Sequence, residues 1–207
     1  MLQRVGFTVQ GAEIEGILHL PDGATAGGAA VLGGRNGMGE PGAYLCEALA
    51  AAGIAALRFD HRAEDPASRL ADAGGAIRLL RAHPAIPQLT AVVGHSYGAA
   101  IAALAAGRDS RLRAAVLLAP PADRPYFGTA KPVAELSRTR ARVLIVSAAA
   151  DTIVDPGDAG RYDAVLTQAG AVHRLVSIAG ADHQFSQPAA REAMLAAVTA
   201  WLRDAFG

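Results

Sequence analysis

The chain is short of the features that define several classes of protein. Its 207 residues include one cysteine, Cys46, which excludes an internal disulfide and a cysteine-rich zinc site. Lys plus Arg number 19 and Asp plus Glu number 19, and no cluster of basic residues indicates a nucleic-acid or anionic-membrane partner. No apolar stretch resembles a signal peptide or a membrane span, so we expect a cytoplasmic protein without membrane insertion.

What the chain does contain is typical of a globular protein with one core. Hydrophobic residues make up 52% of the sequence and charged residues 18%. The length predicts a single domain that spans residues 1–207. Cys46 lies in a helical segment with Leu45 and Leu49, a position that favours a buried, inert thiol.

The hydrophobic pattern predicts a leading antiparallel strand pair followed by alternating strands and helices. Residues 2–9 and 14–20 alternate between apolar and polar and form the predicted hairpin. Further strands are predicted at residues 29–32, 54–59, 89–93, 114–118, 143–146 and 174–178, and helices at 44–52, 68–81, 99–106, 158–168 and 189–206. Short apolar runs separated by helices indicate a parallel sheet covered on both faces. We therefore predict an α/β fold with a mostly parallel, eight-stranded sheet.

One motif stands at the junction of a predicted strand and a predicted helix. Residues 94–98 read Gly-His-Ser-Tyr-Gly, the G-x-S-x-G pattern of a nucleophile elbow, in which a sharp turn exposes the serine hydroxyl above the sheet. In a chain with 23 glycines the pattern also arises by chance. Ser96 is thus a candidate nucleophile that requires a base and an acid further along the chain.

His183 is the best candidate for the base among six histidines. It follows the last predicted strand and precedes the terminal helix. A loop that leaves the carboxyl end of a parallel strand can reach a nucleophile at the same edge of the sheet. His95 lies inside the elbow, and its ring is expected to point away from Ser96.

Four carboxylates compete to orient that base. Asp151 follows the strand predicted at 143–146 and is our first choice. Asp155 is close to it but also suits the start of the next helix. Asp182 is adjacent to His183, and consecutive loop side chains usually diverge. Asp123, after the preceding strand, is the substitute if Asp151 fails.

A pocket for a developing oxyanion is also expected. One donor is predicted to be the backbone N–H of Tyr97, at the start of the helix after Ser96. The second is expected from the glycine-rich loop at residues 33–39, where the backbone can approach a substrate closely. This loop lacks the following Lys-Ser or Lys-Thr of a nucleoside-triphosphate loop, so an anion pocket is the favoured interpretation.

Taken together, these residues resemble the α/β-hydrolase family over essentially the whole chain. The order Ser96, Asp151, His183 is the family's nucleophile–acid–base order, and residues 180–185 are similar to its catalytic-histidine loop. The resemblance implies Arg35 N–H as the second oxyanion donor, with Asn36 as the neighbour that could replace it. The chain departs from the family pattern in having Gly33 where a histidine is usual.

Among subgroups, the compact size looks like the dienelactone-hydrolase-like and small carboxylesterase members, and Ser96 stands where dienelactone-type sites often use cysteine. Leu118 and Val143 are only 25 positions apart, which leaves no room for a large lid. Tyr126 and Phe127 in this stretch line the substrate pocket in one interpretation and serve only in packing in the other.

The resemblance implies a serine hydrolase that cleaves a carboxylic ester or related small acyl compound through an acyl-enzyme, with no cofactor or metal. A thioesterase, acyltransferase, amidase or perhydrolase would use the same residues. A non-catalytic ligand-binding protein of this fold is the alternative from another class. A homodimer also stays open, because the edge of such a sheet and its terminal helix often pair.

Overall fold

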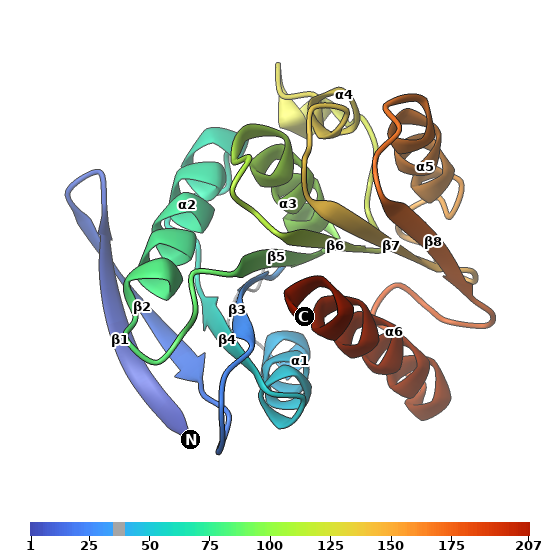
Figure 1. The fold of residues 1–207 in the computed structure, drawn as a ribbon. Coiled ribbons are helices and arrows are strands. Elements are labelled where there is room, and N and C mark those ends of the chain that lie inside the picture. The colour runs from blue at the N-terminus through green and yellow to red at the C-terminus, as the bar shows by residue number, and fades with distance from the viewer. Residues whose placement is uncertain (35–39) are drawn as a thin grey trace.

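The structure is a computed structural model that describes residues 1–34 and 40–207. Its eight strands form one sheet in the order β1-β2-β4-β3-β5-β6-β7-β8 (Figure 1). The strands are β1 (Leu2–Val9), β2 (Ala12–His19), β3 (Gly27–Leu32), β4 (Ile54–Phe59), β5 (Thr90–His95), β6 (Ala114–Leu118), β7 (Arg142–Ala148) and β8 (His173–Ile178). The helices are α1 (Glu40–Ala51), α2 (Pro66–Ala82), α3 (Tyr97–Arg108), the 3₁₀ turn η1 (Pro125–Phe127), α4 (Pro132–Leu136), α5 (Asp158–Gln168) and α6 (Pro188–Phe206).

The pairing of the strands confirms the predicted sheet. β1 pairs antiparallel with β2, β2 pairs antiparallel with β4, and the remaining neighbours are parallel. β2 and β3 both begin two residues earlier than predicted. β2 begins at Ala12 rather than at residue 14, and β3 begins at Gly27 rather than at residue 29. Gly27 and Gly28 pair with Ile54 and Ala55 of β4, and glycine carries no side chain that a hydrophobic pattern could register.

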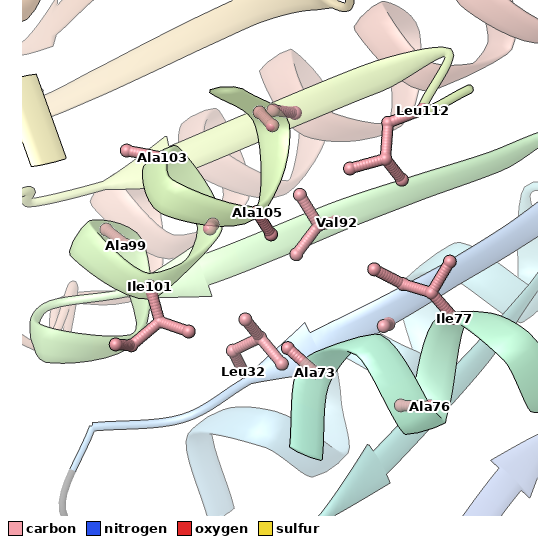
Figure 2. Close-up of a cluster of buried hydrophobic side chains, with 14 of the residues drawn as sticks. Leu32, Ala73, Ala76, Ile77, Val92, Ala99, Ile101, Ala103, Ala105 and Leu112 are labelled. Carbon is pink, nitrogen blue, oxygen red and sulfur yellow. The ribbon is translucent and has the colours of Figure 1, made fainter. Parts of the chain in front are cut away.

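Helices cover both faces of the sheet, as predicted (Figure 1). Buried residues of α1 and α6 pack on one face, and those of α2, α3, α4 and α5 pack on the other. Figure 2 shows part of the core on the face that α2, α3, α4 and α5 cover. There Leu32 and Val92 of the sheet pack with Ile77 of α2 and Ile101 of α3. Most other α3 side chains in this core are alanines, which lets the helix that follows Ser96 lie close to the sheet.

Two further expectations of the sequence are met. Cys46 is buried under the sheet, and burial raises the pKa of its thiol to about 12, so it stays protonated and inert. The stretch between β6 and β7 contains only η1 and the short helix α4, so no large lid is inserted there. None of the described helices is both long and apolar enough to cross a membrane.

Candidate active site

Ser96 lies in the sharp turn between β5 and α3. Its backbone has φ 55° and ψ −123°, a conformation that residues with a side chain rarely adopt. Two glycines make the turn possible. A Cβ on Gly94 would lie 2.1 Å from the carbonyl oxygen of Gly98, and a Cβ on Gly98 would lie 2.2 Å from that of Leu32. The sequence therefore folds locally into the expected sharp turn from strand to helix.

The structure brings Ser96, His183 and Asp151 together from three separate loops at the carboxyl edge of the sheet. The Ser96 hydroxyl lies 2.9 Å from His183 Nε2, and His183 Nδ1 lies 2.6 Å from Asp151 Oδ2. An ionised carboxylate only accepts hydrogen bonds, so Nδ1 carries the proton of a neutral His183 ring. Nε2 is then free to accept the proton of the Ser96 hydroxyl.

Asp151 is fixed by the backbone that follows it. Its Oδ1 accepts hydrogen bonds from the N–H groups of Ile153 and Val154, at 2.8 and 2.9 Å, while Oδ2 faces His183. The side chains of Asp151 and His183 are 2% and 7% exposed. Two backbone donors and an imidazole compensate the cost of burying this carboxylate, and they hold it in one orientation.

The other three carboxylates considered from the sequence are occupied elsewhere. Asp155 accepts a hydrogen bond from the Gly157 N–H at 2.9 Å, just before α5. Asp123 pairs with Arg161 at 2.7 Å. Asp182 bonds within its own loop. Within the described part of the chain, no group of three His, Cys, Asp or Glu side chains is arranged to hold a metal ion.

Of the predicted oxyanion donors, Tyr97 lies among the described residues. Arg35 and Asn36 lie outside the described residues. Tyr97 is the first residue of α3, and the first N–H groups of a helix have no carbonyl partner within that helix. Gly34 lies close to Ser96, since a Cβ built on Gly34 would lie 3.9 Å from the Ser96 Cβ.

Aromatic side chains gather around Tyr97, beside the elbow. The Tyr97 ring lies 5.5 Å from that of Tyr126 and 5.2 Å from that of Phe127. Phe127 is 2% exposed and therefore packs in the core, whereas Tyr126 is 50% exposed. These two residues also line a cleft of about 460 Å³ between α2, α3 and η1.

Arg69 reaches the same region from α2, and sequence reasoning did not single it out. Its buried guanidinium donates a hydrogen bond to the Gly34 carbonyl at 2.8 Å and stacks 4.6 Å from the centre of the Tyr97 ring. One buried arginine thus contacts both the loop after β3 and the first residue of α3. The only sequence signal was its position on the apolar face of a predicted helix.

His95 makes contacts that the sequence did not predict. Its Nε2 lies 2.7 Å from the main-chain carbonyl oxygen of His183, and the two rings are 5.0 Å apart. Burial lowers the pKa of His95 to about 4, so its ring is neutral at neutral pH. The sequence predicted only that this ring points away from Ser96 and gave no partner for it.

Comparisons with known proteins agree with this architecture. The model of the dienelactone hydrolase family matches residues 45–205. DcsB, solved in complex with its substrate analogue, is 16% identical, with 100% of this chain and 99% of that chain covered and a TM-score of 0.87. A dienelactone hydrolase from Anabaena variabilis is 24% identical, with 99% and 97% covered and a TM-score of 0.82. An esterase domain from Rhodothermus marinus is 22% identical, with 100% of both chains covered and a TM-score of 0.80.

A search among curated proteins finds no match. The structural likenesses establish the α/β-hydrolase fold, because at such identities the fold is the property they share.

Proposed function

The chain belongs to the dienelactone hydrolase family, and from this premise we propose that it is a serine hydrolase that cleaves carboxylic esters through an acyl-enzyme on Ser96. One observation carries the proposal. Ser96, His183 and Asp151 form a continuous chain of hydrogen bonds, with the hydroxyl at 2.9 Å from the imidazole and the imidazole at 2.6 Å from the carboxylate.

The first half of the reaction forms the acyl-enzyme. Ser96 Oγ attacks the carbonyl carbon of the ester while its proton passes to His183 Nε2. Asp151 stabilises the imidazolium through the Nδ1–H hydrogen bond. The bond between the carbonyl carbon and the alcohol oxygen then breaks, and the alcohol leaves with the proton from His183.

The second half regenerates the enzyme. A water molecule gives its proton to His183 Nε2 and attacks the acyl carbon, and Ser96 leaves as the hydroxyl after recovering a proton from His183. The carboxylic acid is released. No redox change occurs, and the atoms of ester and water account for both products.

Negative charge develops on the carbonyl oxygen in both halves. The Tyr97 N–H at the start of α3 is our proposed donor, supported by the helix dipole behind it. Arg35 N–H, or that of Asn36, is the expected second donor from the loop after β3. Removing one donor of an oxyanion pocket typically slows catalysis by about 100- to 1000-fold.

Hydrolysis of short p-nitrophenyl esters tests this function. Wild-type protein should turn over the acetate and butyrate, and Ser96→Ala should lose at least about a thousandfold in kcat. Ser137→Ala is a matched control, because that exposed hydroxyl donates its hydrogen bond to the Ala134 carbonyl at the end of α4. The proposal fails if Ser96→Ala retains turnover.

A panel of thioesters and amides with the same acyl group defines the substrate class. A preference for thioesters or amides would keep the three residues but replace ester hydrolysis with thioesterase or amidase activity. Product analysis with an added alcohol would reveal an acyltransferase, because the acyl group would then pass to the alcohol instead of to water.

A further inference from the structure

His95 contacts the base of the proposed site rather than the nucleophile beside it in the chain. It is the last residue of β5, and its Nε2 lies 2.7 Å from the main-chain oxygen of His183. The His95 ring also lies 5.0 Å from the His183 ring and 6.4 Å from the Phe185 ring, centre to centre. The ring is therefore packed against the loop between β8 and α6.

The direction of this hydrogen bond follows from its partner. A carbonyl oxygen only accepts, so His95 Nε2 carries the proton. Burial lowers the pKa of His95 to about 4, which keeps its ring uncharged at neutral pH. A second positive charge beside His183 would oppose the imidazolium that the proposed reaction forms. His95 is thus a donor that adds no such charge.

Two consecutive residues hold His183 at two separate points. Ser96 faces the Nε2 end of its ring, while His95 binds its main-chain carbonyl. The elbow is itself fixed to the sheet, since the Ser96 N–H donates to the Leu118 carbonyl at 2.9 Å. The His95 side chain therefore links the backbone of His183 directly to β5, the strand that leads to Ser96.

The loop that carries His183 is also held by the residues around His183, because Ala181 and Phe185 are buried in the core on the sheet. Ala150 N–H donates to the Ala181 carbonyl at 2.9 Å, and the Phe185 N–H bonds within the loop to the Asp182 carbonyl at 3.0 Å. Phe185 has φ 50°, an uncommon conformation for a residue with a side chain. The His95 side chain adds a hydrogen bond to the main-chain carbonyl of His183 itself.

We propose that His95 is a positioning residue, whose Nε2–H holds the main chain of His183 so that the His183 ring stays aligned between Asp151 and Ser96. This inference rests on the proposed function, because alignment matters only if His183 transfers a proton. A displacement of about 1 Å at a reacting group typically costs about 100-fold in rate. Loss of one such bond should therefore reduce catalysis without abolishing it.

Three substitutions separate this role from a packing role. His95→Phe keeps a ring but removes the donor. His95→Gln places an amide N–H near the position of Nε2, and His95→Asn carries the same amide on a side chain too short to reach the His183 carbonyl. His83→Gln is the control, because the His83 ring accepts a hydrogen bond from the Ala85 N–H in the turn after α2 and has no other hydrogen bond among the residues that the structure describes.

The measurements are kcat and KM for a p-nitrophenyl ester and the rate at which a phosphonate modifies Ser96. We expect His95→Phe and His95→Asn to lower kcat and the labelling rate by about 10- to 100-fold, with KM changed less than about threefold. His95→Gln should recover most of the lost rate. The control should match wild type.

A proton NMR measurement adds a readout that does not depend on turnover. The Nδ1–H between His183 and Asp151 should give a low-field resonance in wild type and in His95→Gln, and a broadened or absent one in His95→Asn. Equal rates and equal resonances in the Gln and Asn variants would overturn the inference, even if both lost thermal stability.

Failure of the proposed function would look different. A wild-type protein that no phosphonate labels would overturn the proposed function and the inference with it. A labelled, active wild type whose His95 variants keep full rates would overturn the inference alone.

Discussion

Replacing Gly98 by alanine tests whether the elbow is as tightly built as the structure indicates. The added Cβ would lie 2.2 Å from the Leu32 carbonyl oxygen and 2.6 Å from that of Gly33. An ordinary van der Waals contact at a Cβ is 3.4–4 Å. Both obstacles are backbone atoms, so no side chain can move aside. The start of α3 must therefore shift away from the end of β3 by roughly 1 Å.

This shift has an energetic and a catalytic cost. Forcing extra atoms into a packed core typically costs about 1–3 kcal/mol, and a site hemmed in by backbone belongs at the upper end of that range. The displaced end of α3 carries the Tyr97 N–H and lies directly after Ser96. A misplacement of about 1 Å there should lower kcat for a p-nitrophenyl ester by about 100-fold.

Gly160→Ala is the matched control, because it makes the same chemical change in α5 with nothing within 4 Å of the added Cβ. Alanine is the better helix former, so this variant should gain about 0.5–1 kcal/mol. Urea unfolding measures both stabilities. A Gly98→Ala protein with wild-type stability and wild-type kcat would refute the packing argument.

Three further substitutions each test one buried side chain. Asp151→Asn should lower kcat by about 10³- to 10⁴-fold with little change in KM, because an amide no longer enforces the tautomer of His183. Burial lowers the pKa of His61 to about 4, so the unfolded chain takes up the proton first as pH falls from about 6.5 to 4. The free energy of unfolding should fall over this window, by at most about 1.4 kcal/mol per pH unit from this group, and fall less in His61→Phe. Tyr162→Phe should cost about 1–3 kcal/mol in urea unfolding, because the buried Pro121 carbonyl loses the hydroxyl 2.8 Å away.

Each of these predictions has a control or a contradicting result. Asp155→Asn should leave kcat unchanged, since that carboxylate accepts its hydrogen bond from the Gly157 N–H. An equal loss in both Asn variants would contradict the assignment of Asp151. A His61→Phe protein with an unaltered pH slope would show that another group is responsible. An unchanged urea midpoint in Tyr162→Phe would show that the Pro121 carbonyl finds another donor.

The sheet and its helices were predictable because their signals are local. Each strand of the parallel part is a short apolar run, and each helix between them starts or stops near a polar or proline-rich stretch. Asp151 stood out among four carboxylates because it follows β7 after only a short turn, and such a position meets the other strand ends at one edge of the sheet. The start of β3 at Gly27 was missed because its pairing is a backbone property.

The contacts of His95 and Arg69 were beyond sequence reasoning for a different reason. His95 Nε2 meets a carbonyl 88 positions away, and the Arg69 guanidinium meets a carbonyl 35 positions away. Both of these partners are main-chain oxygens, which every residue possesses, so for these two contacts the sequence contains no complementary side chain to look for. Only the path of the loops after β8 and β3 reveals them.

Covalent labelling of Ser96 tests the central claim most directly. An active-serine phosphonate incubated with folded protein should add one adduct per chain, and peptide mapping by mass spectrometry should place it on Ser96. Unfolded protein and His183→Ala should react far more slowly, because the hydroxyl then lacks its base. Absence of an adduct on folded protein, or an adduct at another residue that Ser96→Ala does not prevent, would contradict the account.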